Sequence, residues 1–410
     1  MTYPETLEYL FQQLPMYQRI GQAAYKADLE STVALMKLLG NPEHGLKVVH
    51  VGGTNGKGSV SHLLASIFQE AGYRCGLYTS PHLVDFRERI RVNGQMIPEE
   101  KVVSFVNRYK ADSEKLSLSF FEWSVGLAFD HFRSEKVDIA IVEVGMGGRL
   151  DSTNVVDPEL SIITNIGTDH SQYLGEDPAQ RAREKAGIIK KGKPVVIGRS
   201  QRETEGIFRR IALQLDASIS FADQDFPDDP PPCPLKGAYQ RENFQTVQIA
   251  VERLNSLGWK LNNQALSSGF SNVIKNTGLR GRWEELQPKP RIICDVAHNV
   301  EGLEIVFDQL LNTPRHDLHL VLGFVSDKNV SDILKLVPKE AILYLTQPSI
   351  PRAMAIDRLA QLATDADLKF KEYSTVSEAV KAARSGAIPD DLIFVGGSTF
   401  VVADLISEIK

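Results

Sequence analysis

The chain has 410 residues, of which 42% are hydrophobic, 24% charged and 8% aromatic, the composition of an ordinary globular protein. This length exceeds that of a usual single core, so we expect two domains. The formal net charge of −6 argues against nucleic-acid binding, which normally needs a basic face. No apolar run of the sequence approaches the length that spans a bilayer, so we expect no membrane partner.

The N-terminus and the cysteines bear on the compartment. The opening residues, MTYPETLEYLFQQL, lack the basic start and apolar centre of a signal peptide. Cys75, Cys233 and Cys294 are widely spaced and form neither a disulfide framework nor a zinc-binding pattern. We therefore expect a reduced, cytoplasmic protein. The sequence contains no coiled-coil pattern that would indicate an oligomer, so we expect a monomer.

The predicted elements alternate between strand and helix after a helical N-terminal segment that closes at Gly40. Short apolar runs predict buried strands in LKVVHV, VDIAIVEV and LSIITNI. Amphipathic stretches predict helices in SHLLASIFQEAG and DPAQRAREKAGIIKKG. This alternation predicts a mainly parallel sheet covered by helices, an α/β fold.

Two proline-rich segments are candidates for a domain boundary. Residues 222–237 carry four prolines in five positions and must be a loop, but a helical pattern resumes directly afterwards. The segment LQPKPR is the better boundary, because a second series of strands follows it in RIICDVAHN, DLHLVLGF, AILYLT and DLIFVGG. We predict an N-terminal domain at residues 1–287 and a smaller C-terminal α/β domain at residues 288–410.

A glycine cluster lies between the first predicted strand and the helix that follows it. Backbone N–H groups and the positive end of a helix meet at such a point, where phosphate oxygens bind well. The strict phosphate-loop pattern is not met, because Val51 occupies its first glycine position and Gly58 separates Lys57 from Ser59. The alternative is an ordinary glycine turn. The combination of strand, glycines, lysine and helix favours a nucleoside triphosphate site made of Gly53, Thr54, Asn55, Gly56, Lys57, Gly58 and Ser59.

A second glycine motif, EVGMGGRLDSTN, partly matches the dinucleotide-binding fingerprint. Gly145 and Gly147 occupy its first two glycine positions, but Leu150 occupies the third, and no helix start follows. A nicotinamide cofactor is therefore not expected here.

Polar residues follow three other predicted strands. Glu143 lies at the strand edge where a doubly wound sheet binds its ligands, and a carboxylate there could hold Mg²⁺. Asp169 and His170 follow the next strand, and Ser80 lies in YTSPHL. Each has a plain alternative on its own: a glutamate turned to solvent, a hydrogen-bonded loop histidine or a proline turn. Together they predict a metal site beside the glycine cluster.

The ordered motifs resemble those of the folylpolyglutamate synthase/dihydrofolate synthase family of the Mur ligase superfamily. The resemblance rests on GTNGKGS, YTSPHL, EVGMGGRLDSTN, GTDHSQYLG, REKAGIIKKGKP, RGRWE and DVAHN, with weaker similarity to the C-terminus. It implies a P-loop-containing, mainly parallel sheet domain followed by a smaller Rossmann-like α/β domain.

The resemblance also implies roles for individual residues. The glycine cluster would hold the phosphates of ATP, and Ser80, Glu143 and His170 would be magnesium ligands. Lys185 would be carbamylated and would help to position a second magnesium ion. A carbamate supplies oxygen ligands, which a lysine ammonium cannot.

Further contacts are implied for ATP and for the pteroate substrate. ATP would lie between the domains and would also contact Asn243, Arg282, Asp295 and His298. The pteroate region would include Phe120, Phe121 and Glu122, although Phe121 could equally be a core residue. Arg149 could bind a substrate carboxylate or be a solvated surface residue. Two departures from the family pattern, Arg280 in place of proline and Phe400 in GSTF, leave substrate detail open.

The implied reaction is ATP-dependent ligation of L-glutamate to dihydropteroate, reduced folates or both, through an acyl phosphate. Lys57 and Mg²⁺ would neutralise charge on the transferred phosphoryl group, and His170 or the carbamate of Lys185 would assist proton removal from the amine. One alternative is a cell-wall Mur ligase, which would need a UDP-binding domain before the phosphate loop, where about forty-five residues lie. Another is a nucleotide-dependent switch without ligase chemistry.

Overall fold

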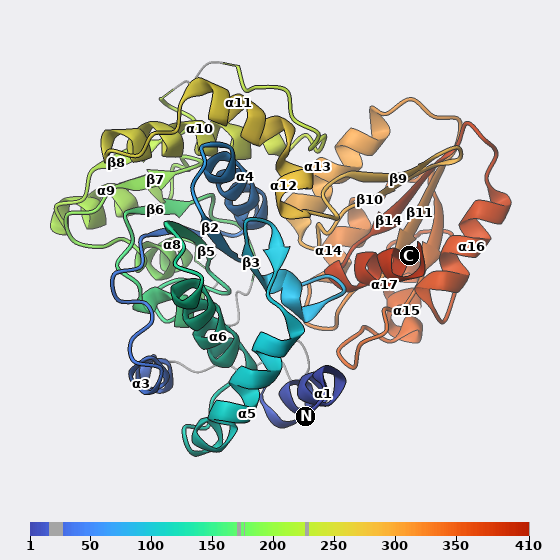
Figure 1. The fold of residues 1–410 in the computed structure, drawn as a ribbon. Helices are drawn as coiled ribbons and strands as arrows, with labels where there is room; N and C mark the ends of the chain where they lie inside the picture. The colour runs from blue at the N-terminus through green and yellow to red at the C-terminus, as the bar shows by residue number, and fades with distance from the viewer. Residues whose placement is uncertain (16–27, 170–173, 176, 226–228, 410) are drawn as a thin grey trace. The chain divides into compact units, whose positions relative to one another are not determined.

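A computed structural model describes residues 1–15, 28–169, 174–175, 177–225 and 229–409 (Figure 1). Its contacts divide the chain into two compact units. Unit 1 comprises Met1–Pro234 and Gln240–Leu279, and unit 2 comprises Leu235–Tyr239 and Arg280–Lys410. Within the described residues, none of the helices combines the length and apolar character that crossing a membrane requires.

Unit 1 is built on an eight-stranded sheet with the order β4-β3-β2-β5-β1-β6-β7-β8. The six strands from β2 to β8 run parallel, whereas β3 and β4 add an antiparallel edge. The strands are β1 (Val48–Gly52), β2 (Cys75–Tyr78), β3 (Ile90–Val92), β4 (Gln95–Met96), β5 (Ile139–Glu143), β6 (Leu160–Ile163), β7 (Val195–Ile197) and β8 (Ile219–Phe221).

Helices of unit 1 pack on this sheet. Helix α4 contacts β1, β2 and β5 and also packs against α10, α11 and α12, and α6 packs on β2. The described helices are α1 (Tyr3–Gln13), α3 (Glu30–Leu38), α4 (Lys57–Glu70), α5 (Glu99–Lys115), α6 (Phe120–Ser134), α8 (Pro178–Ala186), α9 (Glu205–Gln214), α10 (Gln240–Ser256), α11 (Asn263–Ser271) and α12 (Val273–Thr277), with the short 3-10 helices η2 (Phe86–Arg89) and η3 (Ser152–Val155).

The register of the central strands explains where the site lies. All five residues of β1 are buried, and β1 pairs in parallel with both β5 and β6. Val51 lies opposite Glu143 on one side, and Gly52 lies opposite Ile163 on the other. The carboxyl ends of these three strands therefore meet at one edge, from which the polar loops leave.

Unit 2 has a six-stranded sheet with the order β13-β12-β11-β14-β10-β9, parallel except for β9. Its strands are β9 (Glu284–Pro288), β10 (Arg291–Cys294), β11 (Leu318–Leu322), β12 (Ile342–Leu345), β13 (Phe370–Glu372) and β14 (Leu392–Gly396). Its helices are α13 (Val300–Leu311), α14 (Val330–Lys335), α15 (Ile356–Asp365), α16 (Val376–Gly386) and α17 (Thr399–Ile409). The predicted α/β fold with two sheets is confirmed.

The division into units differs from the predicted boundary between residues 287 and 288. Strand β9 pairs antiparallel with β10, so the segment LQPKPR forms part of a hairpin rather than a linker. This ladder ties residues 284–288 to the second sheet, and the change of unit occurs at Leu279 and Arg280. Helix α8 is also shorter than the predicted stretch, because it ends at Ala186 with Gly187 as its C-cap.

Candidate active site

The glycine loop, residues 53–56, joins β1 to the N-terminus of α4. Gly56 is the N-cap of α4 and has a φ of 87°, and Gly53 has a φ of 136°. A side chain at Gly53 would collide with Thr164, and one at Gly56 would lie 2.2 Å from Oδ1 of Asn243. Only glycine suits both positions, so the loop wraps closely around the start of the helix.

Residues that follow β6 hold the glycine loop. The backbone N–H groups of Thr54 and Asn55 donate to Asn165, to its carbonyl oxygen at 3.0 Å and to its Oδ1 at 2.9 Å. The Thr164 hydroxyl donates to the carbonyl oxygen of Asn55 at 2.6 Å, and the Gly167 N–H donates to Oγ1 of Thr54 at 2.9 Å. Neutral groups therefore fix the loop. Thr54 and Asn55, two of the predicted nucleotide contacts, also hold its shape.

Two lysines converge on the glycine loop. Lys57 donates to the carbonyl oxygens of Gly53 and Thr54 at 3.2 and 3.0 Å, and buried Lys185 donates to that of Gly53 at 2.9 Å. Burial, and then the charge of Lys57, lower the pKa of Lys185 to about 7. Asp169 acts in the opposite direction. The sequence pattern around Lys185 is that of an ordinary basic helix end. The structure instead places its amine against the glycine loop.

Two of the three predicted magnesium ligands lie together. The buried Glu143 ends β5, and its Oε2 accepts the backbone N–H of Ser80 at 3.1 Å. Carboxylate and hydroxyl oxygens are ligands that Mg²⁺ prefers, so these residues fit a magnesium ion. His170, the third predicted ligand and a predicted proton acceptor, lies outside the described residues.

The remaining phosphate-loop residues lie in the first turn of α4. Gly58 and Ser59 are buried there, and the Ser59 hydroxyl accepts a hydrogen bond from Nε2 of Gln240 at 3.1 Å. Asn243 in turn donates to Oε1 of Gln240 at 2.8 Å. The structure therefore brings Asn243 to the glycine loop, as the predicted ATP contact requires, although its role stays a prediction.

The predicted substrate residues of SFFEW differ in their surroundings. Phe120 is buried in the core, whereas Phe121 is partly exposed and lies 6.2 Å from the ring of Tyr78. Both carboxylate oxygens of buried Glu122 accept hydrogen bonds, from the N–H of Ser119 at 2.6 Å and from Thr32 at 3.4 Å. Ser119 and Glu122 form a capping box at the start of α6, so the Glu122 carboxylate stabilises that helix end, and its role at the substrate stays a prediction.

Arg149 lies at the surface beside α8. Its side chain is 54% exposed and pairs with Glu184 at 2.9 Å, while its backbone N–H donates to the Glu184 carbonyl oxygen. Glu184 directly precedes Lys185 in α8, so the ion pair flanks the site, and binding of a substrate carboxylate by Arg149 stays a prediction.

In unit 2, three predicted ATP contacts flank the hairpin β9–β10: Arg282 precedes it, and Asp295 and His298 follow it. Asp295 is buried, accepts the N–H of Trp283 at 2.6 Å and of Ala297 at 2.8 Å, and also accepts the hydroxyl of Tyr239. Burial raises the pKa of Asp295 in spite of these donors. His298 is half-buried, and Arg282 donates to the Gly281 carbonyl oxygen at 3.3 Å. Asp295 therefore organises this turn.

Comparison with known proteins identifies the family. The Mur ligase middle domain matches residues 51–210, and the Mur ligase, glutamate ligase domain, matches residues 281–399. A dihydrofolate synthase/folylpolyglutamate synthase of Bacillus subtilis (strain 168) is 32% identical over 407 residues, which cover 92% of this chain and 93% of the relative. The chain belongs to the folylpolyglutamate synthase/dihydrofolate synthase family.

Solved structures of this family match both units. Escherichia coli FolC in complex with DHPP and ADP has a TM-score of 0.86 at 28% identity, covering 100% of this chain and 98% of that one. A bifunctional folylpolyglutamate synthase/dihydrofolate synthase with Mn, AMPPNP and L-glutamate bound has a TM-score of 0.84 at 28% identity over the same shares. A probable bifunctional folylpolyglutamate synthase/dihydropteroate synthase of Haloferax volcanii is 32% identical over 98% of this chain, and the chain spans 50% of that relative's length.

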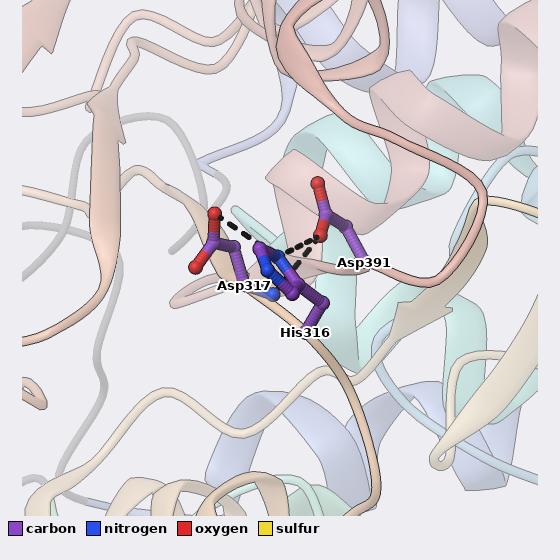
Figure 2. A group of neighbouring side chains, drawn as sticks. All are labelled: His316, Asp317 and Asp391. Atoms are coloured by element: carbon purple, nitrogen blue, oxygen red, sulfur yellow. Dashed lines mark hydrogen bonds and ion pairs between the residues drawn. The ribbon is translucent and has the colours of Figure 1, made fainter.

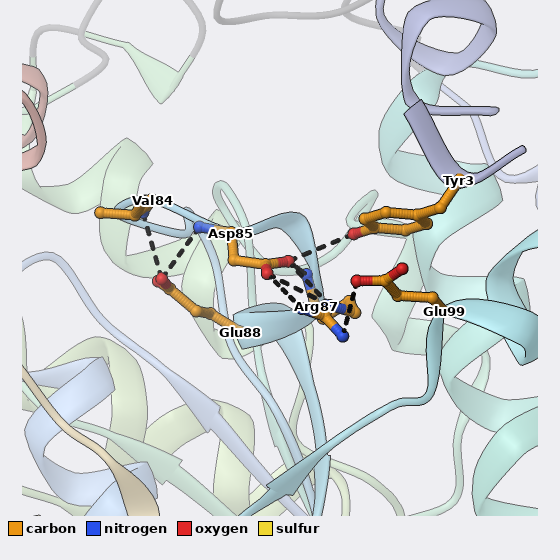
Figure 3. A network of polar contacts seen from close by, with 6 residues as sticks. All are labelled: Tyr3, Val84, Asp85, Arg87, Glu88 and Glu99. Atoms are coloured by element: carbon orange, nitrogen blue, oxygen red, sulfur yellow. Dashed lines mark hydrogen bonds and ion pairs between the residues drawn. The ribbon is translucent and has the colours of Figure 1, made fainter. Parts of the chain in front are cut away.

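This family member also has a loop after Ser80, the carboxylate loop, residues 83–88 (Figure 3). Glu88 accepts the backbone N–H groups of Leu83, Val84 and Asp85 at 2.7, 3.1 and 2.9 Å. Arg87 pairs with Asp85 at 2.7 Å and with Glu99 of α5 at 3.2 Å. These acidic side chains therefore fix the conformation of the backbone that follows Ser80, a predicted magnesium ligand.

The N-terminal helix completes this network. The Tyr3 hydroxyl of α1 donates to Asp85 at 3.2 Å, and the Arg87 guanidinium lies over the Tyr3 ring at 5.3 Å (Figure 3). Buried Arg89 donates to Nδ1 of His82 at 2.8 Å. Burial, and then the charge of Arg89, lower the pKa of His82 to about 3, so its ring is neutral and accepts this bond.

One group outside the predicted site has a metal-like arrangement. His316, Asp317 and Asp391 of unit 2 lie together, with the His316 ring 3.4 Å from both carboxylates (Figure 2). Buried Asp391 accepts the N–H groups of Asp317 and Ile388 at 2.9 and 2.8 Å and pairs with His319. These bonds give Asp391 a structural role in joining the starts of β11 and β14.

Proposed function

We propose that the chain is an ATP-dependent ligase that joins L-glutamate to dihydropteroate, reduced folates or both, in folate biosynthesis and polyglutamylation. The observation that carries the proposal is one strand edge of unit 1, where the glycine loop, Lys185 and the pair Ser80 and Glu143 come together. Family membership supports the same reaction, as do relatives whose structures hold ADP with DHPP, or AMPPNP with Mn and L-glutamate.

The chemistry overcomes a poor leaving group. A carboxylate oxygen of the folate attacks the γ-phosphorus of ATP, the bond to the bridging oxygen breaks, and ADP and an acyl phosphate form. The deprotonated amine of L-glutamate then attacks the acyl carbon. The nitrogen loses its proton, for which His170 or the carbamate of Lys185 is the proposed acceptor, and phosphate leaves with the electron pair of the broken C–O bond as the amide forms. The N–H groups at the start of α4 and the ammonium of Lys57 bind phosphate oxygens and stabilise charge that develops on the transferred group.

A divalent cation fits beside this loop. Ser80 and Glu143 would hold Mg²⁺, together with His170 as a proposed third ligand, and the ion would neutralise charge on the phosphates. Asn243 of unit 1, and Arg282, Asp295 and His298 of unit 2, remain proposed nucleotide contacts. Phe120, Phe121, Glu122 and Arg149 remain proposed substrate contacts.

Carbamylation of Lys185 is a further part of the proposal. Its amine is buried against the Gly53 carbonyl oxygen and near the charge of Lys57, which together favour the neutral form. A neutral amine attacks CO₂, forming an N–C bond while one C=O bond opens onto oxygen and the nitrogen loses a proton. The product is an anion that would relieve the repulsion from Lys57 and offer oxygen ligands to a second Mg²⁺.

The ligase proposal is tested by ADP formation with ATP, Mg²⁺ and L-glutamate, with dihydropteroate and tetrahydrofolate offered separately. Turnover with both indicates a bifunctional enzyme, and turnover with one identifies its substrate. The variant Lys57→Ala should lose about 10²-fold or more in turnover, the size of effect seen when one preorganised charge-stabilising group is removed. Absence of glutamate-dependent turnover with either folate would contradict the proposal.

The carbamate is tested separately with ¹³C-labelled bicarbonate and NMR. We expect a carbamate signal in the native protein and in Lys190→Ala, the matched control, whose lysine is half-buried and donates to the Asn154 carbonyl oxygen. Lys185→Ala should lose both signal and activity, and short carboxylates should partly restore the activity. Full activity of Lys185→Ala would refute the carbamate while leaving the ligase proposal intact.

A further inference from the structure

A buried chain of amides ends on the phosphate loop. Asn243 donates through Nδ2 to Oε1 of Gln240 at 2.8 Å, and Gln240 donates through Nε2 to Oγ of Ser59 at 3.1 Å. Gln240 and Ser59 are each 1% exposed, and Asn243 is 4% exposed. Gln240 is the first residue of α10, and Ser59 lies 181 residues before it in the first turn of α4.

The direction of these hydrogen bonds fixes the role of the Ser59 hydroxyl. Because Oε1 of Gln240 accepts from Asn243, its amide nitrogen faces Ser59 and must donate. Oγ of Ser59 is therefore the acceptor in this pair. Its own O–H proton is directed away from Gln240 and is available to donate to another acceptor.

The acceptor is identified by the position of Ser59. The first N–H groups of an α-helix have no partner within the helix and attract anions. A hydroxyl held as a donor in that same turn adds one more hydrogen bond to an anionic oxygen, and Lys57 adds a positive charge to the same loop. A phosphate oxygen of a nucleotide matches this set of donors.

We infer that Gln240 is a positioning residue that holds the Ser59 hydroxyl as a hydrogen-bond donor to a phosphate oxygen of the nucleotide. The inference rests on the proposed ATP site and adds a residue that the sequence motifs did not include. Gln240 acts through Ser59 and does not itself contact the nucleotide. This part of its contribution therefore exists only while Ser59 has a hydroxyl, whereas its bond with Asn243 does not depend on that hydroxyl.

A double-mutant cycle on ADP binding tests this dependence. We expect Gln240→Met and Ser59→Ala each to weaken ADP binding by about three- to tenfold, the value of one oriented hydrogen bond. The cycle is measured in an Asn243→Ala background, because Gln240 also accepts from Asn243, a proposed nucleotide contact. In that background the double variant should bind no more weakly than the variant with Ser59→Ala alone. The KM for ATP should rise by a similar factor in Gln240→Met, with kcat and the KM for L-glutamate nearly unchanged.

Two further variants keep the test decisive. Gln248→Met is the matched control, because Gln248 is also buried in α10 but lies two helical turns further on, and ADP binding should be unchanged. Gln240→Glu preserves the shape but presents an acceptor, so the Ser59 proton turns towards it. This variant should bind ADP more weakly than Gln240→Met, and it serves if the methionine variant does not fold.

The possible outcomes separate the inference from the function on which it rests. Native protein that neither binds ADP nor turns over glutamate would overturn the proposed function. Native protein that binds ADP, with Gln240 variants of equal affinity, would overturn the inference alone. Effects of Gln240→Met and Ser59→Ala that add in the double variant would also overturn it, since Gln240 would then act independently of the hydroxyl.

Discussion

Two loops of unit 1 lead to the predicted ligands of the site, and they are held in different ways. Neutral groups of Thr164 and Asn165 hold the glycine loop, and its two converging lysines donate only to loop carbonyl oxygens among the contacts described above. The carboxylate loop is instead held by Glu88, Asp85 and Arg87 (Figure 3).

The two loops differ in whether their charged side chains are used to hold the loop itself or can bind a ligand. A loop fixed by backbone and amide groups keeps its positive charge for an anionic ligand and keeps its shape over a wide pH range. A loop fixed by carboxylates loses its supports when these are protonated. We therefore predict that substitutions in the glycine loop mainly weaken nucleotide binding, whereas substitutions in the carboxylate loop mainly lower the free energy of unfolding.

The largest effect should come from Gly56→Ala. The φ of 87° is costly for any residue with a side chain, and the new methyl group would lie 2.2 Å from Oδ1 of Asn243. We expect ADP affinity, measured by calorimetry, to fall about tenfold or more, since about 1.4 kcal/mol of loop distortion suffices for that. Gly72→Ala is the matched control, because Gly72 has a φ of 85° with nothing within 4 Å. Equal ADP affinities of the two variants would contradict the role of the glycine loop in nucleotide binding.

The next effect is on stability rather than on ADP binding, and it should come from Glu88→Gln. The two oxygens of Glu88 accept three backbone N–H groups. In the variant an NH₂ group replaces one of these oxygens, so at least one backbone N–H would face another donor and lose its hydrogen bond. We expect the free energy of unfolding in urea to fall by about 1–3 kcal/mol, with ADP affinity almost unchanged. The control Glu99→Gln removes a half-exposed ion pair with Arg87 and should cost less than about 1 kcal/mol. A Glu88 variant as stable as the control would contradict the role given to this carboxylate.

The smallest effect concerns pH and Asp85. Partial burial alone would raise the pKa of Asp85, but hydrogen bonds and charge from Arg87 bring it below the ordinary value. A lowered pKa contributes stability above the ordinary aspartate value of about 3.9, and this contribution is lost as pH falls through the folded value. The difference in unfolding free energy between native protein and Asp85→Asn should therefore be constant near pH 6 and shrink below about pH 4. If this difference in unfolding free energy instead grew as the pH falls, the pKa of Asp85 would be raised in the folded protein, and the role given to Arg87 would be wrong.

Sequence patterns were sufficient for the strands, the glycine loop and the polar strand ends, because each depends on local spacing. The capping box of Ser119 and Glu122 was also readable from its spacing, which would have indicated a structural role for that glutamate. The burial of Lys185 was not readable, since its helix ends in a basic run typical of a solvated surface. Nor was the contact between Gln240 and Ser59, because nothing local links residues 181 positions apart.

The assignment of Leu235–Tyr239 to unit 2 has a consequence for how the chain is completed. These five residues precede α10, α11 and α12, which belong to unit 1, so the two units are interleaved along the polypeptide. During synthesis, Tyr239 emerges 56 residues before Asp295, and Lys236 emerges 73 residues before Gln309, which donates to its carbonyl oxygen. A fragment that starts at Arg280 would leave Asp295 and Gln309 without these contacts, so unit 2 cannot be excised intact as one continuous segment.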